Sequence, residues 1–555
     1  MIGDILATFT ATRVILGLLG LGIVYSWLQG VQISRRVRAL GVHAPLIKSY
    51  YPLSLDFIIA SVKNGTKGTD LEYWSGIFEG FRASGKYQNQ VNTFEVNPKS
   101  NFRIVFTVEP ENIKAILAGQ FADYGKGKKF HDEWKEFLGD SIFATDGELW
   151  SRSRHLLRPM FARERIVDTE IFEKHIHKLI PMLGGSVNRD GSTVVDVGSL
   201  FFRYTLDAST DYLFGQSVDS LDNPKTVFAE SFQYVLHRQS IIFRAGPVNF
   251  LLSRKLFREN LKKMDDFMQP FIDQVLAVSP EELEKKLAKK DTFLDALARF
   301  TRDPKVLRDQ LVAVLLAGRD TTAATLAFCV FELSRHPSVV KKLRAEIFSV
   351  VGPNKKPSYT DIKDMKYLNA VLNETMRLYP VVPFNVRHAL KDTTLPTGGG
   401  LDGRSPVGVL EGTRIVYSTM VMQRRRDLYD PPPPPPTPGS EKADPNARPY
   451  FDPGLFIPER WLSSWHPKPW HFIPFNGGPR ICLGQQFATI EMAYTITRIL
   501  QAYSEIVGVG CPPVGVHPKF KFDVTLSPGG PMNCVFVKSG EEEQGGKVTP
   551  STAKA

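Results

Sequence analysis

The chain has 555 residues, 43% hydrophobic and 23% charged, which are the proportions of a globular protein and exclude a disordered or fibrous chain. Its four cysteines lie far apart without a C-x-x-C pair, so neither a zinc site nor a disulfide framework is indicated. The formal net charge of +11 is compatible with three kinds of partner: a nucleic acid, an anionic membrane surface or an acidic protein. The last two are favoured, because the sequence contains no nucleic-acid-binding motif.

An apolar segment opens the chain. Residues 5–28 carry one charge, Arg13, and a helix of this length would cross a bilayer, which needs about 20 residues. A cleavable signal peptide is the alternative, but no small-x-small cleavage site closes the segment. Three arginines follow at residues 35–38, and positive flanks stay in the cytosol. The sequence therefore predicts a single-pass anchor with a cytosolic main domain.

Composition divides the rest of the chain. Two prolines between residues 42 and 57 suggest a hinge. Further along, a run of six prolines lies in a proline- and charge-rich insertion. A solvated surface loop is favoured there over a polyproline II segment that a partner domain recognises. The predicted segments are an anchor (1–30), a basic flank and hinge (31–57), one large domain (58–538) with a proline-rich insertion (430–448), and a polar tail (539–555).

A long helix is predicted over residues 303–335, because an Asp-Pro pair starts it and helix-compatible residues continue to the next proline. Asp320 and Thr321 are adjacent near its middle. An isolated pair of this kind usually faces water or bonds to the preceding turn. Here Thr321 is expected to bond the Ala317 carbonyl while Gly318 leaves a gap in the side-chain wall, so that an acid and an alcohol can deliver protons in a small cavity.

Residues 398–403, GGGLDG, formally fit the dinucleotide fingerprint G-x-G-x-x-G. The fingerprint needs a strand before it and a helix after it, and the following residues RSPVG cannot open such a helix. The chain therefore shows no nicotinamide or flavin site of its own, and electrons for a redox reaction would come from another protein.

Residues 475–484, FNGGPRICLG, centre on Cys482. The thiolate is the metal-binding form of cysteine, so positive charge and backbone donors must hold it ionised. Arg480 and the N-terminus of the helix predicted after Gly484 would supply both. An ordinary buried cysteine is the alternative for a lone residue. The spacing Phe-x-x-Gly-x-Arg-x-Cys-x-Gly instead resembles the haem-binding loop of the cytochrome P-450 monooxygenases.

The resemblance extends from about Phe121 to Val537 and narrows to a subgroup. Four stretches are similar to the fungal n-alkane and fatty-acid hydroxylases, membrane-bound enzymes of the endoplasmic reticulum: residues 121–164, 317–323, 385–403 and 475–488. The resemblance implies the cytochrome P-450 fold, mainly α with small β-sheets. It also implies haem b as cofactor, molecular oxygen as co-substrate, and NADPH-derived electrons delivered by a separate reductase.

The resemblance also gives roles to matching residues. Cys482 would bind the haem iron, whose thiolate ligand favours O–O cleavage. Asp320 and Thr321 would direct protons. The haem propionates would be held by Trp150, Arg154, Arg387 and Arg480. A buried network, structural rather than catalytic, would be formed by Glu374, Arg377 and Arg460.

The implied activity is hydroxylation of the terminal or near-terminal carbon of a long-chain alkane or fatty acid. A haem-thiolate isomerase or dehydratase and a non-catalytic haem protein are the alternatives, and neither needs the acid–alcohol pair. Two features depart from the family pattern. Gln423 occupies a position where the resemblance leads us to expect a histidine, and the proline-rich insertion lengthens a surface loop. Both departures leave the mode of reductase docking open. Substrate shape would be set by residues 124–138, 248–252, those after Pro380, and 526–532.

Overall fold

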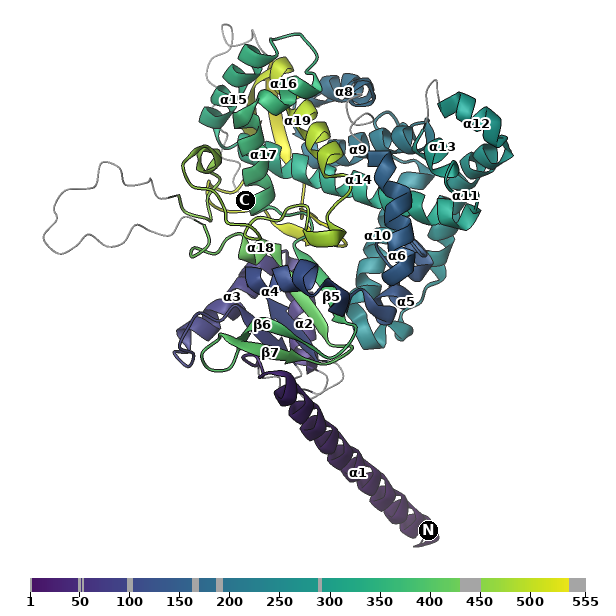
Figure 1. Cartoon of the computed structure of the whole chain (residues 1–555), viewed down its shortest axis with the longest axis vertical. Coiled ribbons are helices and arrows are strands. Elements are labelled where there is room, and N and C mark those ends of the chain that lie inside the picture. Colours follow the sequence, from purple (N-terminus) through teal and green to yellow (C-terminus); the bar gives the residue numbers. More distant parts are fainter. Residues whose placement is uncertain are drawn as a thin grey trace, which may run out of the picture.

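The computed structural model describes residues 2–47, 51, 54–96, 103–161, 169–185, 193–287, 292–429 and 451–538. The proline-rich insertion and the polar tail lie outside these ranges, and so the predictions about them stay predictions. Helices dominate the described chain and its strands form small sheets, which confirms the predicted fold class (Figure 1).

The helices of the first half are α1 (Ile2–Leu40), α2 (Leu55–Lys67), α3 (Asp70–Ala83), α4 (Pro110–Lys114), α5 (Gly127–Leu138), α6 (Gly147–Leu157), α8 (Glu170–Leu183), α9 (Val197–Phe214), α10 (Val227–Ala245) and α11 (Lys255–Ala277). Those of the second half are α12 (Pro280–Leu287), α13 (Phe293–Ala298), α14 (Pro304–Leu333), α15 (Pro337–Val350), α16 (Tyr359–Asp364), α17 (Lys366–Leu378), α18 (Thr419–Met422) and α19 (Gln485–Ala502). Short non-α turns include η2 (Ala115–Gly119), η3 (Phe121–Asp123), η4 (Arg158–Phe161), η5 (Gly246–Leu251), η6 (Pro458–Leu462) and η7 (Gly478–Arg480).

The largest sheet has the strand order β1-β2-β8-β5-β3, in which only β2 and β8 run parallel. Its strands are β1 (Thr93–Val96), β2 (Ile104–Thr107), β8 (Arg414–Ser418), β5 (Phe384–Ala389) and β3 (Tyr124–Gly125). The C-terminal strand β12 (Asn533–Lys538) pairs with β4 (Val195–Asp196) and β9 (Tyr503–Gly508), and two hairpins are formed by β6 (Thr393–Gly399) with β7 (Ser405–Val409) and β10 (Phe520–Phe522) with β11 (Leu526–Pro528).

The helix α14 crosses the body of the protein and connects its two hydrophobic cores (Figure 1). The side chain of Asp303 caps it by accepting hydrogen bonds from two backbone N–H groups, and Pro304 fills the first turn, as predicted. Its N-terminal half packs in the core with α5, α10 and α11, whereas its half after Ala323 packs with α17 and α19. The predicted functional segment therefore lies where the two cores meet.

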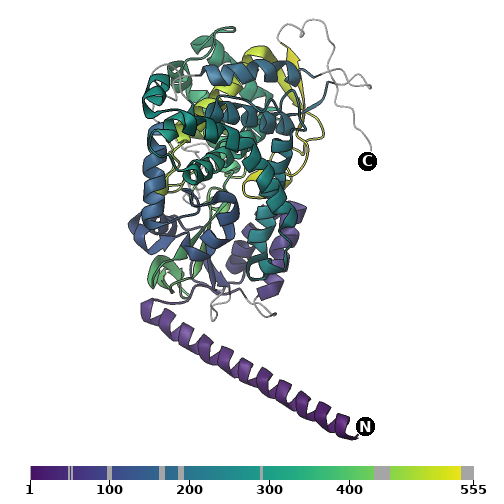
Figure 2. The ribbon, with the colours of Figure 1, turned by 90° about the vertical axis from the view of Figure 1, so that its right-hand side faces the viewer.

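The helix α1 projects from the sheet-rich end of the body, as Figures 1 and 2 show. Residues Leu16–Leu40 are apolar and long enough to cross a membrane, with exposed side chains at Leu18 and Leu21. A second helix, α14, passes the same test but is mostly buried, as a core helix is. The predicted boundary at residue 30 falls within α1, so the division into anchor and hinge stays a prediction.

The end of α1 is fixed against the β6–β7 hairpin. A Cβ atom on Gly408 would lie 2.2 Å from the carbonyl oxygen of Val37, and one on Gly41 would lie 2.6 Å from that of Pro406. Only glycine allows backbones to approach this closely. Val37 itself is fully buried, and the N–H of Val42 donates to Pro406. The helix is thus joined rigidly to the sheet.

Candidate functional site

The loop that carries Cys482 runs from η7 to the start of α19. The backbone N–H of Cys482 donates to the carbonyl of Phe475 at 3.0 Å and closes the loop. Gly478 has a φ of +66°, and a Cβ there would lie 1.9 Å from the carbonyl oxygen of Leu117, so the position requires glycine. The glycine-rich approach predicted from sequence therefore serves close packing of this loop on η2.

The thiol of Cys482 has accessible surface, yet it lies deep among protein atoms. Burial raises its pKa above the ordinary value, and the N–H of Gly484 and the charge of Arg154 offset this only in part. Of the two predicted sources of stabilisation, the backbone at the start of α19 contacts the thiol, whereas the charge next to it is that of Arg154, and Arg480 pairs with Asp146. A coordinated cation deprotonates a thiol outright, so this cysteine suits a metal ligand better than a free thiolate.

Four predicted residues gather beside this loop. Arg480 stacks on the indole of Trp150, with 4.6 Å between guanidinium carbon and ring centroid, and donates to Asp146 at 2.5 Å. Arg154, one turn further along α6, donates to the carbonyl of Ile481 at 3.2 Å. Arg387 is buried on β5, close enough to Arg480 that its charge lowers the pKa of Arg480. The structure thus brings Trp150, Arg154, Arg387 and Arg480 together.

A fourth cation, which the sequence motifs did not indicate, belongs to this cluster. Burial and the charges of Arg387 and Arg480 lower the pKa of Lys126 well below its ordinary value. The pKa of Arg480 falls to about 10 through burial and the charge of Arg387, and among the described residues its Nε has no hydrogen-bonding partner. Clustered, underpaired cations require anions nearby. The two propionates of a haem fit this requirement.

The acid and the alcohol of α14 lie on different sides of the helix. The hydroxyl of Thr321 donates to the carbonyl of Ala317 at 2.6 Å, which confirms the predicted back-bond. Asp320 is buried and accepts from Arg319 at 2.9 Å; burial raises its pKa despite that charge. Gly318 faces Ser209 of α9, where a Cβ would lie 3.2 Å from the hydroxyl, so it serves helix packing rather than opening a gap.

A small cavity lies between α14 and the cysteine loop. Thr321 lines it from α14, Phe475 from the loop, and Ala488 from α19. Pro380 and Val381, which precede β5, complete part of its wall. The predicted alcohol and the predicted metal-binding loop therefore share one internal space.

A second buried acid lies close to this cavity. Glu491 of α19 is almost fully buried, and burial raises its pKa to about 8. The hydroxyl of Thr322 lies beside it and lowers the pKa slightly, although within the described chain that hydroxyl makes no well-formed hydrogen bond. The position of Glu491 nine residues after Cys482 gave no signal in the sequence, because a glutamate on a helix is ordinarily exposed.

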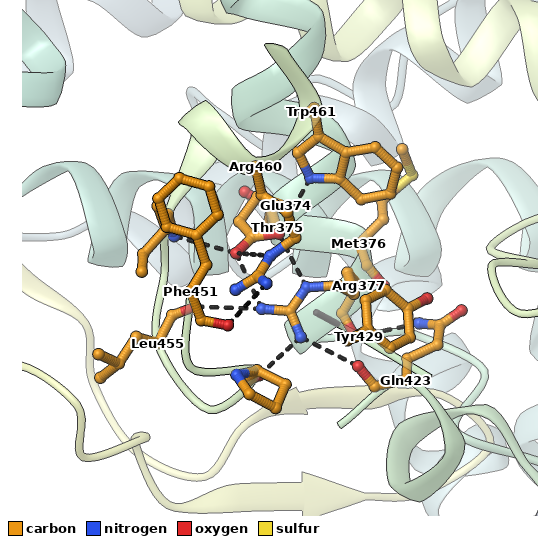
Figure 3. Close-up of polar contacts among 12 residues, drawn as sticks. Glu374, Thr375, Met376, Arg377, Gln423, Tyr429, Phe451, Leu455, Arg460 and Trp461 are labelled. Carbon is orange, nitrogen blue, oxygen red and sulfur yellow. Dashed lines mark hydrogen bonds and ion pairs between the residues drawn. The ribbon is translucent and has the colours of Figure 1, made fainter. Parts of the chain in front are cut away.

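The predicted structural network is present and completely buried (Figure 3). Arg377 makes a bidentate pair with Glu374, with both N–O distances at 2.8 Å. Arg460 approaches the same carboxylate at 3.4 Å, and the indole N–H of Trp461 donates to it at 2.9 Å. Burial alone would raise the pKa of Glu374, but the two arginines lower it overall. The carboxylate is therefore ionised inside the protein.

Gln423 belongs to this network rather than to a docking surface. It is fully buried; its amide donates to the carbonyls of Met376 and Arg377 and accepts from the N–H of Ile473. Its own carbonyl accepts from Arg377 at 2.9 Å (Figure 3). A residue in this position cannot contact a reductase directly.

The mainly α fold, the cysteine loop and the buried cations beside it fit a haem-thiolate class of protein. The family profile described as Cytochrome P450 matches residues 77–433 and 444–529, and the chain belongs to that family. "Cytochrome P450 monooxygenase pvhE" of Talaromyces variabilis is 45% identical over 91% of this chain and 92% of its own length. "Cytochrome P450 52A12" of Debaryomyces hansenii is 38% identical over 88% of this chain and 91% of its own length. "Cytochrome P450 52A1" of Candida tropicalis is 38% identical over 76% of each chain.

Proposed function

We propose that this cytochrome P450 hydroxylates the terminal or near-terminal carbon of long-chain fatty acids or alkanes. The observation that carries the proposal is the cavity shared by Thr321 and the loop of Cys482. It provides one space beside the cysteine loop in which an apolar chain end, oxygen and the Thr321 hydroxyl can meet. The likeness to the fungal n-alkane and fatty-acid hydroxylases, and the relatives of the 52A group, support the choice of substrate class.

In this proposal haem b, when bound, supplies oxygen activation at iron held by Cys482. Trp150, Arg154, Arg387 and Arg480 hold its propionates, and Lys126 adds a further cation at their edge. Burial raises the pKa of Asp320 despite the charge of Arg319, which favours a part in proton delivery, and Thr321 presents a hydroxyl in the cavity. Electrons come from NADPH through a separate reductase.

The location we propose is the endoplasmic reticulum membrane, with α1 crossing it once and the catalytic domain in the cytosol. The exposed apolar turn η5, with Phe250 76% and Leu251 72% exposed, supports a second membrane contact. Removal of residues 1–30 should weaken membrane association while haem content is retained, as measured by flotation and haem assay. Loss of haem from the truncated protein would contradict an independent anchor.

The experiment for the activity is a substrate panel with purified enzyme, reductase, NADPH and oxygen. Hexadecane, palmitate and lauric acid are incubated separately, and the hydroxylated carbon is identified by mass spectrometry. Product at the terminal or adjacent carbon supports the proposal. A product that needs neither NADPH nor reductase would indicate a haem-thiolate isomerase or dehydratase, and haem binding without any turnover would indicate a non-catalytic haem protein.

A further inference from the structure

The hydroxyl groups that line the cavity differ in what they bond. Three threonines of α14 contribute to its wall: Thr321, Thr322 and Thr325. The hydroxyl of Thr321 donates to the carbonyl of Ala317 at 2.6 Å, and that of Thr325 donates to the carbonyl of Thr321 at 2.8 Å. A hydroxyl has one proton to donate, so both of these protons are engaged within the helix. The hydroxyl of Thr322 is buried and makes no well-formed hydrogen bond within the described chain, so its proton remains available.

An acid lies directly behind this hydroxyl. Glu491 of α19 is 2% exposed, and its carboxyl lies beside the hydroxyl of Thr322. Burial raises the pKa of Glu491 to about 8, and Thr322 lowers it only in part. No cation of a described residue forms an ion pair with this carboxyl. At neutral pH Glu491 is therefore mostly protonated, and a protonated carboxyl is a hydrogen-bond donor.

The other polar neighbours of Glu491 are neutral. The hydroxyl of Tyr204, which is fully buried on α9, lies 3.0 Å from the hydroxyl of Thr495. Thr495 donates its own proton to the backbone carbonyl of Glu491 at 2.7 Å, so Tyr204 is the donor in that pair. Burial and the charge of Glu491 raise the pKa of Tyr204 well above its ordinary value. Among these neighbours, Thr322 is the one that reaches the cavity wall.

Asp320, the acid expected from the sequence, is placed less directly. Its carboxylate accepts from Arg319 at 2.9 Å, and Asp320 is not among the residues that line the cavity. Hydroxylation by molecular oxygen consumes two protons for each product, because the second oxygen atom leaves as water. A second acid in contact with the cavity wall would help to meet this demand.

We infer that Glu491 donates a proton to the cavity through Thr322. The carboxyl O–H of Glu491 breaks as an O–H bond forms at Oγ1 of Thr322, and Thr322 releases its own hydroxyl proton to oxygen or water in the cavity. The carboxylate that remains takes up a proton from solvent before the next turnover. This inference rests on the proposed hydroxylation and adds a proton route that is separate from Asp320 and Thr321.

The first test measures the ratio of hydroxylated product to NADPH consumed by the full-length holoenzyme with reductase, using the compound of the panel that yields most product. Glu491→Gln removes the acidic proton, and Thr322→Val removes the hydroxyl, each with little change of shape. Either substitution should lower the ratio by about tenfold at neutral pH, less than the about 10²- to 10⁴-fold of a full general acid, because the Thr321 route remains. The double variant should lose no more than a single one, because both act on one route. The matched control is Thr497→Val, a buried threonine of α19 whose hydroxyl donates to a carbonyl of its own helix, and it should leave the ratio unchanged.

The second test follows pH. In the wild type the ratio should fall as pH rises through about 8, because the ionised carboxyl of Glu491 has no proton to donate, and both variants should lack this fall. Infrared spectroscopy of the oxidised holoenzyme gives a measurement that needs no turnover. A protonated-carboxyl band should disappear over the same pH range in the wild type and be absent from Glu491→Gln. In Thr322→Val the band should persist to higher pH, because the lost hydroxyl lowers the pKa of Glu491.

An unchanged ratio and pH dependence in Thr322→Val at equal haem content would overturn the inference. Losses that add up in the double variant would also overturn it, since additive losses indicate separate routes. If Glu491→Gln does not fold, Thr322→Val decides by the same ratio and pH profile. Failure of the proposed function is recognised separately, as the absence of NADPH-dependent hydroxylated product from the wild type; the infrared titration then decides, and a band unshifted in Thr322→Val overturns the contact on which the proton route depends.

Discussion

Glu374→Gln is the substitution that most directly tests the buried network of Figure 3. The glutamate carboxylate accepts from both nitrogens of Arg377, from Arg460, from Trp461 and from the N–H of Ile457. An amide of the same shape puts two hydrogens where one oxygen accepted. The change also removes the negative charge that both of these arginines contact.

The expected loss of stability follows from complete burial. Glu374, Arg377 and Arg460 are each 0% exposed, so water cannot replace the lost partner. Removing one member of a buried ion pair typically costs about 3–5 kcal/mol. Because the free energy of unfolding of a protein is commonly about 5–15 kcal/mol, we expect a much lower yield of folded holoenzyme.

The assay is denaturant unfolding of the detergent-solubilised holoenzyme, followed by circular dichroism. The control is Asp266→Asn, which breaks an exposed i,i+4 pair with Lys262 and should cost only about 0.3–0.5 kcal/mol. Comparable midpoints for the two variants would refute the view that this network stabilises the fold. Arg377→Lys should fall between them, since it keeps the charge and loses the bidentate contact.

Three further predictions concern the cavity. Cys482→Ser should lose the characteristic thiolate spectrum of the reduced carbon monoxide complex, and a retained spectrum would contradict iron ligation by this residue. Thr321→Ala should lower the ratio of hydroxylated product to NADPH consumed and raise hydrogen peroxide formation, and it should slow product formation by up to about 10²- to 10⁴-fold. An unchanged ratio at equal haem content would mean that the hydroxyl only bonds to the preceding helical turn. Glu491→Gln should make stability less dependent on pH. The pKa of Glu491 is raised from 4.5 to about 8, so in the wild type the unfolded state loses its proton first, and stability falls as pH rises through this window. Unfolding midpoints that decline equally in both proteins would contradict this assignment.

The sequence predicted what local rules determine. The helix expected over residues 303–335 forms over Pro304–Leu333, because its cap and its breaker are both encoded within a few residues. The residues expected to hold the propionates meet although they come from α6, β5 and η7, and the family resemblance supplied that convergence. Periodicity alone could not have done so.

Other features depend on neighbours that are remote in sequence. Lys126 appears as an ordinary surface cation until β5 and η7 come together beside it. Glu491 appears as an exposed helical glutamate until α19 packs against α14. Gln423, expected to bear on reductase docking, is buried because α18 ends beneath the Glu374 network. In each case tertiary packing decides the role of a residue whose local pattern is unremarkable.

The rigid joint between α1 and the β6–β7 hairpin also has a rotational consequence. With α1 in a bilayer and its last turn clamped at Val37 and Gly41, the helix cannot roll without turning the whole catalytic body. An α-helix advances about 1.5 Å and rotates about 100° with each residue. One alanine inserted near Arg35 would therefore turn the part of α1 that precedes it by about 100° relative to the catalytic body. The number of residues before Val37 therefore sets the rotational position of the apolar part of α1 relative to the catalytic body.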